Sequence, residues 1–327
     1  MTAPLPSLLR TTQATAHVAV LIPCYNEAGA IATVVHEFRS ALPEATIYVY
    51  DNNSTDGTAE AARAAGAVVR QERLQGKGHV IRRMFADVEA DFYVLVDGDA
   101  TYDAAVAPAM LDLALSQGLD MVTGVRVAED GAAYRRGHRF GNRVLTGLVG
   151  LVFGDRVSDM LSGYRVFSRR FVKSFPALAS GFETETEFTV HALELAMPIG
   201  ELPVRYRERP AGTASKLNTI RDGVRILRTI IRLVKEERPL PFFSAAAVML
   251  FGAGLVMFWP VLLTYLETGL VPRLPTAILS LGLVLLSFLA LACGLVLDTV
   301  TRGRREAKRI AYLAIPGPLA SAQAGAP

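Results

Sequence analysis

Short apolar runs rich in β-branched residues alternate with longer segments of helical periodicity over the first third of the chain. The short runs predict strands, and the segments between them predict helices. Strands that alternate with helices in this way are typical of an α/β fold with a mainly parallel sheet. The expected strands are residues 18–22, 46–50, 67–70, 92–96 and 121–125, and the expected helices are residues 29–41, 56–65, 78–88 and 105–117.

Two much longer apolar stretches, residues 242–265 and 276–300, follow later in the chain. Each is long enough to cross the hydrocarbon core of a bilayer, which takes about 20 helical residues. Basic residues cluster before the first stretch and after the second, whereas the loop between them holds only Arg273. By the positive-inside rule, both termini and the whole α/β part are expected in the cytoplasm. We therefore expect a multi-pass membrane protein, with two buried core helices as the alternative.

Two further segments carry an apolar face without being long enough to span. Residues 144–153 predict either an interfacial helix or a core helix. Residues 220–234 repeat apolar side chains at helical spacing with arginines between them, which favours a helix along lipid headgroups or one packed on the sheet. The predicted organisation is an N-terminal extension (1–16), an α/β domain (17–218), an amphipathic interfacial helix (219–239), two transmembrane helices (240–300) and a basic cytoplasmic tail (301–327).

Composition narrows the expected partners. Hydrophobic residues make up 51% of the 327 residues, which is high for a protein that is soluble throughout. The excess of hydrophobic residues lies mostly in the two long apolar stretches. The formal charge of +3 is mild, so the basic clusters favour a membrane surface, and nucleic acid is not an expected partner. Cys24 and Cys293 lie in the α/β part and in a span, so no disulfide is expected. Gly252 and Gly254 permit helix packing, which leaves a homo-oligomer open.

Polar side chains follow three of the expected strands, at the sheet edge where nucleotides bind. The first strand leads into Pro-Cys-Tyr-Asn-Glu at residues 23–27, and the second into Asp-Asn-Asn-Ser-Thr-Asp-Gly at 51–57. The carboxylate of Asp51 suits the N–H groups of a nucleobase, with a turn residue as the alternative. Asp97 and Asp99 follow the fourth strand. Two such carboxylates repel each other unless a cation compensates, and oxygen ligands suit Mg²⁺ or Mn²⁺, with an ordinary acidic loop as the alternative.

The order of these segments is more specific than any one of them. Together with Gly-Lys-Gly at 76–78, they resemble the family 2 glycosyltransferases of GT-A fold. Ser-Gly-Tyr-Arg at 162–165, the acidic stretch at 181–187 and Ser-Lys-Leu at 215–217 resemble the polyprenyl-phosphate branch, which includes the dolichyl-phosphate mannose synthases. The resemblance covers residues 17–236. It implies that a sugar passes from a nucleotide-sugar to a polyprenyl phosphate, with inversion of the anomeric carbon.

The resemblance also implies roles for individual residues, carried over by position. The segments after the first two strands hold the nucleoside, the Asp-x-Asp pair holds metal and diphosphate, and basic residues past the sheet hold the acceptor phosphate. Structural ion pairing is the alternative for Arg165 and Lys216, and a structural role is the alternative for Glu185. The implied residues are Pro23, Tyr25, Glu27, Asp51, Lys77 and Asp97 for the nucleotide, Asp97 and Asp99 for Mg²⁺ or Mn²⁺, Asp97, Asp99 and Glu185 for catalysis, and Arg126, Arg139, Arg165 and Lys216 for the acceptor phosphate.

The chemistry of the acceptor agrees with this set of residues. A phosphate monoester, with a second pKa of about 6, is already largely ionised at neutral pH, so it needs fixed cations more than a general base. A glycosyltransferase with a hydroxyl acceptor and an inactive nucleotide-binding membrane scaffold are the alternatives. Residues 100–102 are Ala-Thr-Tyr, where dolichyl-phosphate mannose synthases often carry Leu and a metal-binding Gln, so the sugar and the nucleotide are left open.

Overall fold

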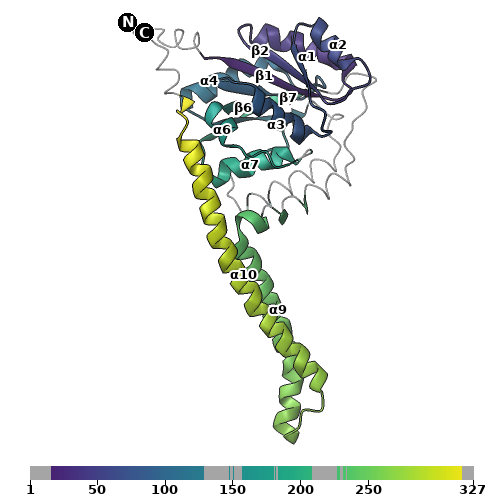
Figure 1. Ribbon diagram of the computed structural model, residues 1–327, viewed down its shortest axis with the longest axis vertical. Coiled ribbons are helices and arrows are strands. Elements are labelled where there is room, and N and C mark those ends of the chain that lie inside the picture. Colours follow the sequence, from purple (N-terminus) through teal and green to yellow (C-terminus); the bar gives the residue numbers. More distant parts are fainter. Residues whose placement is uncertain are drawn as a thin grey trace. The chain divides into compact units, whose positions relative to one another are not determined.

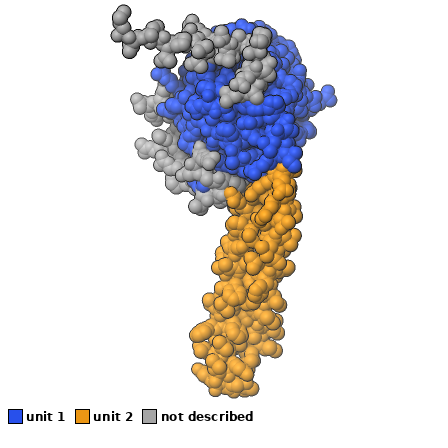
Figure 2. Space-filling model, turned by 90° about the vertical axis from the view of Figure 1, so that its left-hand side faces the viewer, with its two compact units in different colours: residues 1–228, 308–327 blue, residues 229–307 orange. Residues whose placement is uncertain are grey.

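The computed structural model describes residues 16–128, 147, 150, 157–179, 181, 183–207, 227–228, 231–232 and 234–318. Contacts divide the chain into two compact units, of which unit 1 comprises residues 1–228 and 308–327 and unit 2 comprises residues 229–307 (Figure 2). Arg139, Lys216 and most of the predicted segments 144–153 and 220–234 lie outside the described residues.

The described part of unit 1 contains one seven-stranded sheet. Its strands are β1 (Val18–Cys24), β2 (Thr46–Asp51), β3 (Val68–Gln71), β4 (Phe92–Leu95), β5 (Met121–Ala128), β6 (Arg165–Ser168) and β7 (Ile199–Tyr206). They lie in the order β3-β2-β1-β4-β6-β5-β7. β6 runs antiparallel to β4 and β5, and the other neighbouring strands are parallel. The predicted mainly parallel α/β sheet is confirmed.

Helices cover both faces of the sheet (Figure 1). One face carries α1 (Ala28–Ala41), α2 (Thr58–Ala64) and α4 (Ala107–Gln117), which follows the short 3₁₀ helix η1 (Ala104–Val106); the other carries α3 (Lys77–Asp87), α6 (Arg169–Ser174) and α7 (Thr184–Glu194). In β1, Val20 and Ile22 face the first core while Ala19 and Leu21 face the second. Because both faces are buried, such a strand is a continuous apolar run, as the sequence pattern indicated.

An aromatic cluster fixes α7 on the sheet. The ring of Phe188 lies 4.8 Å from that of Phe167 and 4.9 Å from that of Phe175, measured between centroids. Phe85 of α3 lies 6.0 Å from Phe188. Aromatic pairs at these separations stabilise a core beyond their buried area. The first turn of α7, which carries Glu185, is therefore held close to the start of α3.

The last residues of α10 (Leu274–Leu313) belong to unit 1. Nζ of Lys308 lies 2.7 Å from Oε2 of the buried Glu194, and the hydroxyl of Tyr312 donates to Asp120 at 2.7 Å. The guanidinium of Arg170 pairs with the same Asp120 and stacks 4.6 Å from the centre of the Tyr312 ring. Two residues of the segment predicted as a basic tail thus have buried carboxylate partners in the α/β domain.

Unit 2 contains α9 (Pro239–Thr268) and most of α10, and both helices are long and apolar enough to cross a membrane. Small residues lie buried between them at intervals of seven. They are Ala247 and Gly254 on α9, and Ser280, Ser287 and Gly294 on α10. This spacing is typical of helices that pack with a slight left-handed twist. Gly254 therefore packs within the hairpin, whereas a Cβ at Gly252 would meet nothing within 4 Å.

The closeness of the two helices at Gly294 gives a first prediction. A Cβ there would lie 2.9 Å from Cβ of Phe243, while a Cβ at Gly282 on the same helix would meet nothing within 4 Å. Both positions gain about 1 kcal/mol of helix propensity when glycine is replaced by leucine. We expect Gly294→Leu to unfold at lower temperature in detergent than Gly282→Leu, because overpacking costs about 1–3 kcal/mol. Equal melting temperatures would contradict this packing.

Candidate active site

The turns that follow β1 and β2 are tied to each other. The backbone N–H of Asn26 donates to Oγ of Ser54 at 2.9 Å, and the N–H of Thr55 donates to Oδ1 of Asn26 at 2.8 Å. Asn26 and Asn53 have φ values of 53° and 65°, in the left-handed region that asparagine adopts more readily than most residues. The two segments predicted to hold a nucleoside therefore form one fixed rim.

Asp51 ends β2 within this rim and is 5% exposed. Its Oδ2 accepts a hydrogen bond from the N–H of Ser54 at 3.2 Å, while Oδ1 is buried and has no hydrogen-bond partner among the described residues. A buried acceptor without a donor costs about 1–3 kcal/mol, so the site is suited to an incoming N–H group. Of the other predicted nucleotide contacts, Pro23 lies in β1, Tyr25 is 41% exposed, and Glu27 is 8% exposed.

The Gly-Lys-Gly sequence brings the start of α3 against the start of α7. Gly76 has a φ of 135°, in the region that favours glycine. A Cβ at Gly78 would lie 2.2 Å from the carbonyl oxygen of Ala179 and 2.8 Å from Oγ1 of Thr184. Both glycines are thus required by the backbone, and the residue between them points its side chain into the site.

That residue, Lys77, joins two carboxylates. Its Nζ lies 2.6 Å from Oδ1 of Asp97 and 2.5 Å from Oε1 of Glu185. Burial alone would lower the pKa of Lys77, but the two carboxylates outweigh it and raise that pKa above its ordinary value. Burial raises the pKa of Glu185, and the charge of Lys77 opposes the rise. Since 31% of the Asp97 side chain stays exposed, this carboxylate also faces outward.

The Asp-x-Asp turn is compact. Oδ1 of Asp99 accepts hydrogen bonds from the N–H and the hydroxyl of Thr101, at 3.2 and 2.6 Å. Ala100 has a φ of 59°, which costs a residue with a Cβ about 1–2 kcal/mol. A Cβ at Gly98 would lie 2.5 Å from Sγ of Cys24, so the glycine lets the turn pack on β1.

The two aspartates fit a divalent cation that binds together with phosphates. Mg²⁺ is commonly held by one or two carboxylates, and substrate phosphates and waters complete its shell. The ammonium of Lys77 takes one oxygen of Asp97, Oδ1, while 31% of the Asp97 side chain stays exposed. Among the described residues no group of three or more His, Cys, Asp and Glu is arranged for a metal ion. Asp97 and Asp99 would therefore hold such an ion with help from the nucleotide.

Arg126 lies on β5 and is held from two sides. Its Nε and Nη2 donate to Asp159 at 2.8 and 2.7 Å, and its guanidinium carbon lies 5.7 Å from the centre of the Tyr206 ring. Asp159 thus occupies the Nε and Nη2 donors in the bidentate geometry that arginine makes with carboxylates, and 13% of the Arg126 side chain is exposed. The site therefore has a fixed guanidinium near the ends of the strands.

Arg165 is placed differently from its prediction. It is fully buried, and its guanidinium donates to the carbonyl oxygens of Met160 and Ser162 and to Oγ1 of Thr189. A guanidinium enclosed in this way has no surface to offer to a lipid phosphate. We therefore replace its assignment as an acceptor contact with an internal role.

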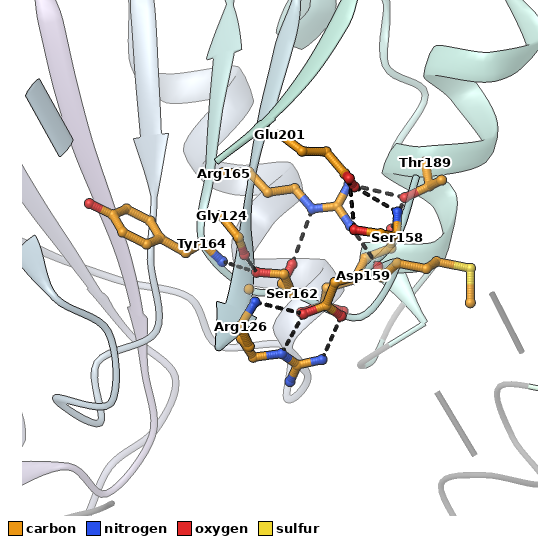
Figure 3. A network of polar contacts seen from close by, with 12 residues as sticks. Gly124, Arg126, Ser158, Asp159, Ser162, Tyr164, Arg165, Thr189 and Glu201 are labelled. Atoms are coloured by element: carbon orange, nitrogen blue, oxygen red, sulfur yellow. Dashed lines mark hydrogen bonds and ion pairs between the residues drawn. The ribbon is translucent and has the colours of Figure 1, made fainter. Parts of the chain in front are cut away.

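Residues 158–163, the bridging loop, link Arg126 to the aspartate pair, and sequence reasoning missed this link. Asp159 holds Arg126, and a Cβ at Gly163 would lie 2.3 Å from Oδ2 of Asp97. The N–H of Gly163 donates to the hydroxyl of Tyr102 at 2.9 Å, which fixes that end of the loop (Figure 3 shows the loop and Arg126). The Ser-Gly-Tyr-Arg motif was the one sequence signal for this loop, but a motif alone does not predict which residue its glycine contacts.

Comparison with known proteins identifies a family and individual relatives. The family model described as Glycosyl transferase family 2 matches residues 19–175. Glycosyltransferase AglJ of Haloferax volcanii is 36% identical over 245 residues, which are 74% of this chain and 80% of the relative. A dolichyl-phosphate hexose transferase of the same organism is 29% identical over 220 residues, which are 67% of this chain and 95% of the relative.

A solved structure has the same fold at low sequence identity. Glucosyl-3-phosphoglycerate synthase from Mycobacterium tuberculosis, in complex with Mn²⁺, UDP-glucose and phosphoglyceric acid, matches with a TM-score of 0.52 and 20% identity. The match covers 68% of this chain and 80% of that protein. The family model, these relatives and the strand-end motifs together show that the chain belongs to the family 2 glycosyltransferases and has their GT-A fold.

Proposed function

We propose that this glycosyltransferase moves a sugar from a nucleotide-sugar to a polyprenyl phosphate at the cytoplasmic face of a membrane, with inversion and with Mg²⁺ or Mn²⁺. The observation that carries the proposal is the bridging loop, which contacts Asp97 through Gly163 and holds Arg126 through Asp159. One short segment thus joins an acidic pair suited to a metal-bound diphosphate and a fixed cation suited to a second phosphate.

The donor half of the proposal is supported by the rim and by the acidic pair. The buried Oδ1 of Asp51 is the acceptor for an N–H of the nucleobase. Asp97 and Asp99 would hold a divalent ion together with the diphosphate, and Lys77 adds a positive charge beside Asp97. The structural neighbour crystallised with Mn²⁺ and UDP-glucose supports a nucleotide-sugar donor and a divalent metal ion.

The acceptor half is supported by chemistry and by a relative. A phosphate monoester arrives already ionised, so the site needs a cation such as Arg126 and no strong base. The dolichyl-phosphate hexose transferase of Haloferax volcanii supports a lipid phosphate, and the two apolar helices support a membrane setting. The basic residues that flank the helices favour a cytoplasmic catalytic domain with both termini on the same side.

The reaction is a single displacement. A divalent ion held by Asp97 and Asp99 would act as a Lewis acid and stabilise the charge that grows on the departing diphosphate. An oxygen of the acceptor phosphate forms a bond to the anomeric carbon, and the bond to the diphosphate breaks with its electron pair on the leaving oxygen. Lys77 keeps a fixed positive charge beside that group, and Glu185 keeps Lys77 in place. Attack on the face opposite the leaving group inverts the anomeric carbon.

The test is transfer of label from radiolabelled nucleotide-sugars by the purified protein in detergent with Mn²⁺. We expect label in the organic phase with polyprenyl phosphate, and none with the corresponding polyprenol. Label that enters only a glycolipid or a polysaccharide would replace the proposal by a hydroxyl acceptor. Absence of label with every donor and acceptor would favour the scaffold, and an α-linked product from an α-linked donor would overturn inversion.

Arg126 gives a prediction for the acceptor half. Arg126→Lys keeps the charge but loses the planar fork, so we expect the KM for polyprenyl phosphate to rise about tenfold, equivalent to about 1.4 kcal/mol. The KM for the nucleotide-sugar is expected to stay within about twofold. Arg205→Lys, an exposed position on the neighbouring strand β7, is the control and is expected to change neither constant. A rise in the donor KM alone would place Arg126 on the donor instead.

A further inference from the structure

Arg165 begins β6 in the interior of unit 1, and the groups that its guanidinium touches are neutral. Nε donates to the carbonyl oxygen of Ser162 at 3.1 Å and Nη2 to that of Met160 at 2.6 Å. Nη1 donates to Oγ1 of Thr189 and contacts the sulfur of Met121, at 3.1 and 3.2 Å. Two of these partners belong to the bridging loop and one to α7, so a single side chain connects two separate segments (Figure 3).

The bridging loop is fixed at each of its ends. The carboxylate of Glu201 on β7 accepts from the N–H and the hydroxyl of Ser158, both at 2.7 Å. The hydroxyl of Ser162 donates to the carbonyl oxygen of Gly124 on β5 at 2.6 Å. Between these anchors, the backbone at Met160 and Ser162 is held by Arg165. The loop thus keeps the positions of Asp159 and Gly163, which touch Arg126 and Asp97.

The other end of the connection leads to Glu185. Oγ1 of Thr189 accepts from Arg165 and donates to the backbone carbonyl oxygen of Glu185, one turn earlier in α7, at 3.2 Å. The guanidinium carbon of Arg165 also lies 5.7 Å from the centre of the Phe188 ring. The turn of α7 that carries Glu185 is therefore packed on Arg165 and hydrogen-bonded to it through Thr189.

The charge of Arg165 is balanced at longer range. Burial lowers the pKa of Arg165 to about 10, and the carboxylates of Glu185 and Asp159 oppose that effect, as does Glu201. The guanidinium therefore stays charged at neutral pH. A buried cation is expensive to desolvate, and an apolar side chain of similar size would fill the space at lower cost. Its donors, however, satisfy loop carbonyls that an apolar residue would leave unpaired.

We infer that Arg165 is a positioning residue which sets the distance between the acceptor cation and the donor carboxylates by joining the bridging loop to α7. It touches neither substrate. On the side of the bridging loop it keeps Arg126 and Asp97 in register, and on the side of α7 it keeps Glu185 against Lys77. The expected loss in kcat rests on the proposed function, whereas the connection between the two segments does not.

Hydrogen exchange of the full chain in detergent tests the connection directly. We expect Arg165→Lys to increase amide exchange in peptides covering residues 158–163 and 184–189 together, because a lysine ammonium cannot span all three acceptors. Arg170→Lys, which keeps a charge beside the buried Asp120, is the matched control and is expected to leave both peptides unchanged. An increase in one peptide only, or in neither, would overturn the inference.

Thr189 provides a second pair of variants, which leaves Arg165 itself in place. Thr189→Val removes the hydroxyl at nearly constant volume, and Thr189→Ser retains it. We expect Thr189→Val to lower kcat about tenfold with the donor KM unchanged, and Thr189→Ser to keep both values within about twofold, since a small displacement of reacting groups is costly. Equal kcat values for the two variants would overturn the inference. If the wild-type chain transfers no sugar to polyprenyl phosphate while exchange still rises in both peptides, the proposed function fails and the connection stands.

Discussion

Replacing Asp99 with asparagine is expected to lower kcat about 10³-fold. The substitution removes a negative charge from the pair that we propose holds the metal-bound diphosphate, and the loss of one such electrostatic group typically costs about 10²–10³ in rate. Asparagine still offers an Oδ1 to the N–H and hydroxyl of Thr101, so the turn is expected to keep its shape. The measurement is kcat at saturating Mn²⁺, with the melting temperature recorded in parallel.

Asp103→Asn is the matched control for this variant. Asp103 lies four residues further on, accepts from the N–H of Ala105 at 3.1 Å, and pairs with Arg207. Asparagine caps the start of a helix as well as aspartate does, so kcat is expected to stay within about twofold. An Asp99→Asn enzyme that kept its rate within about threefold of wild type would remove the basis for a metal site at this pair.

Replacing Gly163 with alanine is expected to lower kcat about 10²-fold. The added Cβ would lie 2.3 Å from Oδ2 and 2.8 Å from Cγ of Asp97, so the bridging loop or the carboxylate must move. Asp97 is also paired with Lys77, and a displacement of about 1 Å at reacting groups costs about 10²-fold in rate. Transfer of sugar to polyprenyl phosphate is the readout.

Gly29→Ala provides the comparison for Gly163→Ala, because a Cβ at Gly29 would meet nothing within 4 Å. Gly29 lies in the first turn of α1, where alanine favours the helix, so activity and stability are expected to match or exceed the wild type. If Gly163→Ala is as active as Gly29→Ala, the contact between the bridging loop and Asp97 has no part in the reaction.

The strands of the first half were predictable because they are buried on both faces and carry continuous apolar runs. β1 to β5 and the helices between them appear within a few residues of their predicted bounds. α7 was not predicted as a helix, because it is buried almost all round and yet carries Glu185, Glu187 and four threonines or histidines that break any apolar stripe. β6 was not predicted as a strand, because its four residues are too few to show the alternation of a strand, and only its first residue belonged to a recognised motif.

The residues of the candidate site were likewise only partly predictable from the sequence. Asp51 ends β2, and Asp97 and Asp99 lie two and four residues after the end of β4, so their shared edge is dictated by the parallel sheet. The carboxylate or carbonyl group that an arginine contacts depends instead on which segments, distant in sequence, the fold brings together. Arg165 begins the short strand β6 between Tyr164 and Val166, whose apolar rings and methyl groups were a sign of burial, and its full burial leaves no surface for the acceptor phosphate that the sequence assigned to it. The role of Asp159 could not be predicted, because it depends on where Arg126 lies in the fold, and no local sequence pattern gives that position.

Binding of Mn²⁺ tests the central claim most directly, because it depends on neither the sugar nor the acceptor. Mn²⁺ is titrated into the purified chain, with and without UDP or GDP, and the free ion is measured by electron paramagnetic resonance. The account predicts one tightly bound Mn²⁺ per chain with a nucleoside diphosphate, much weaker binding without it, and loss of that ion when Asp97 and Asp99 are both replaced by asparagine. Equal Mn²⁺ binding by the wild type and the double variant in the presence of nucleotide would contradict it.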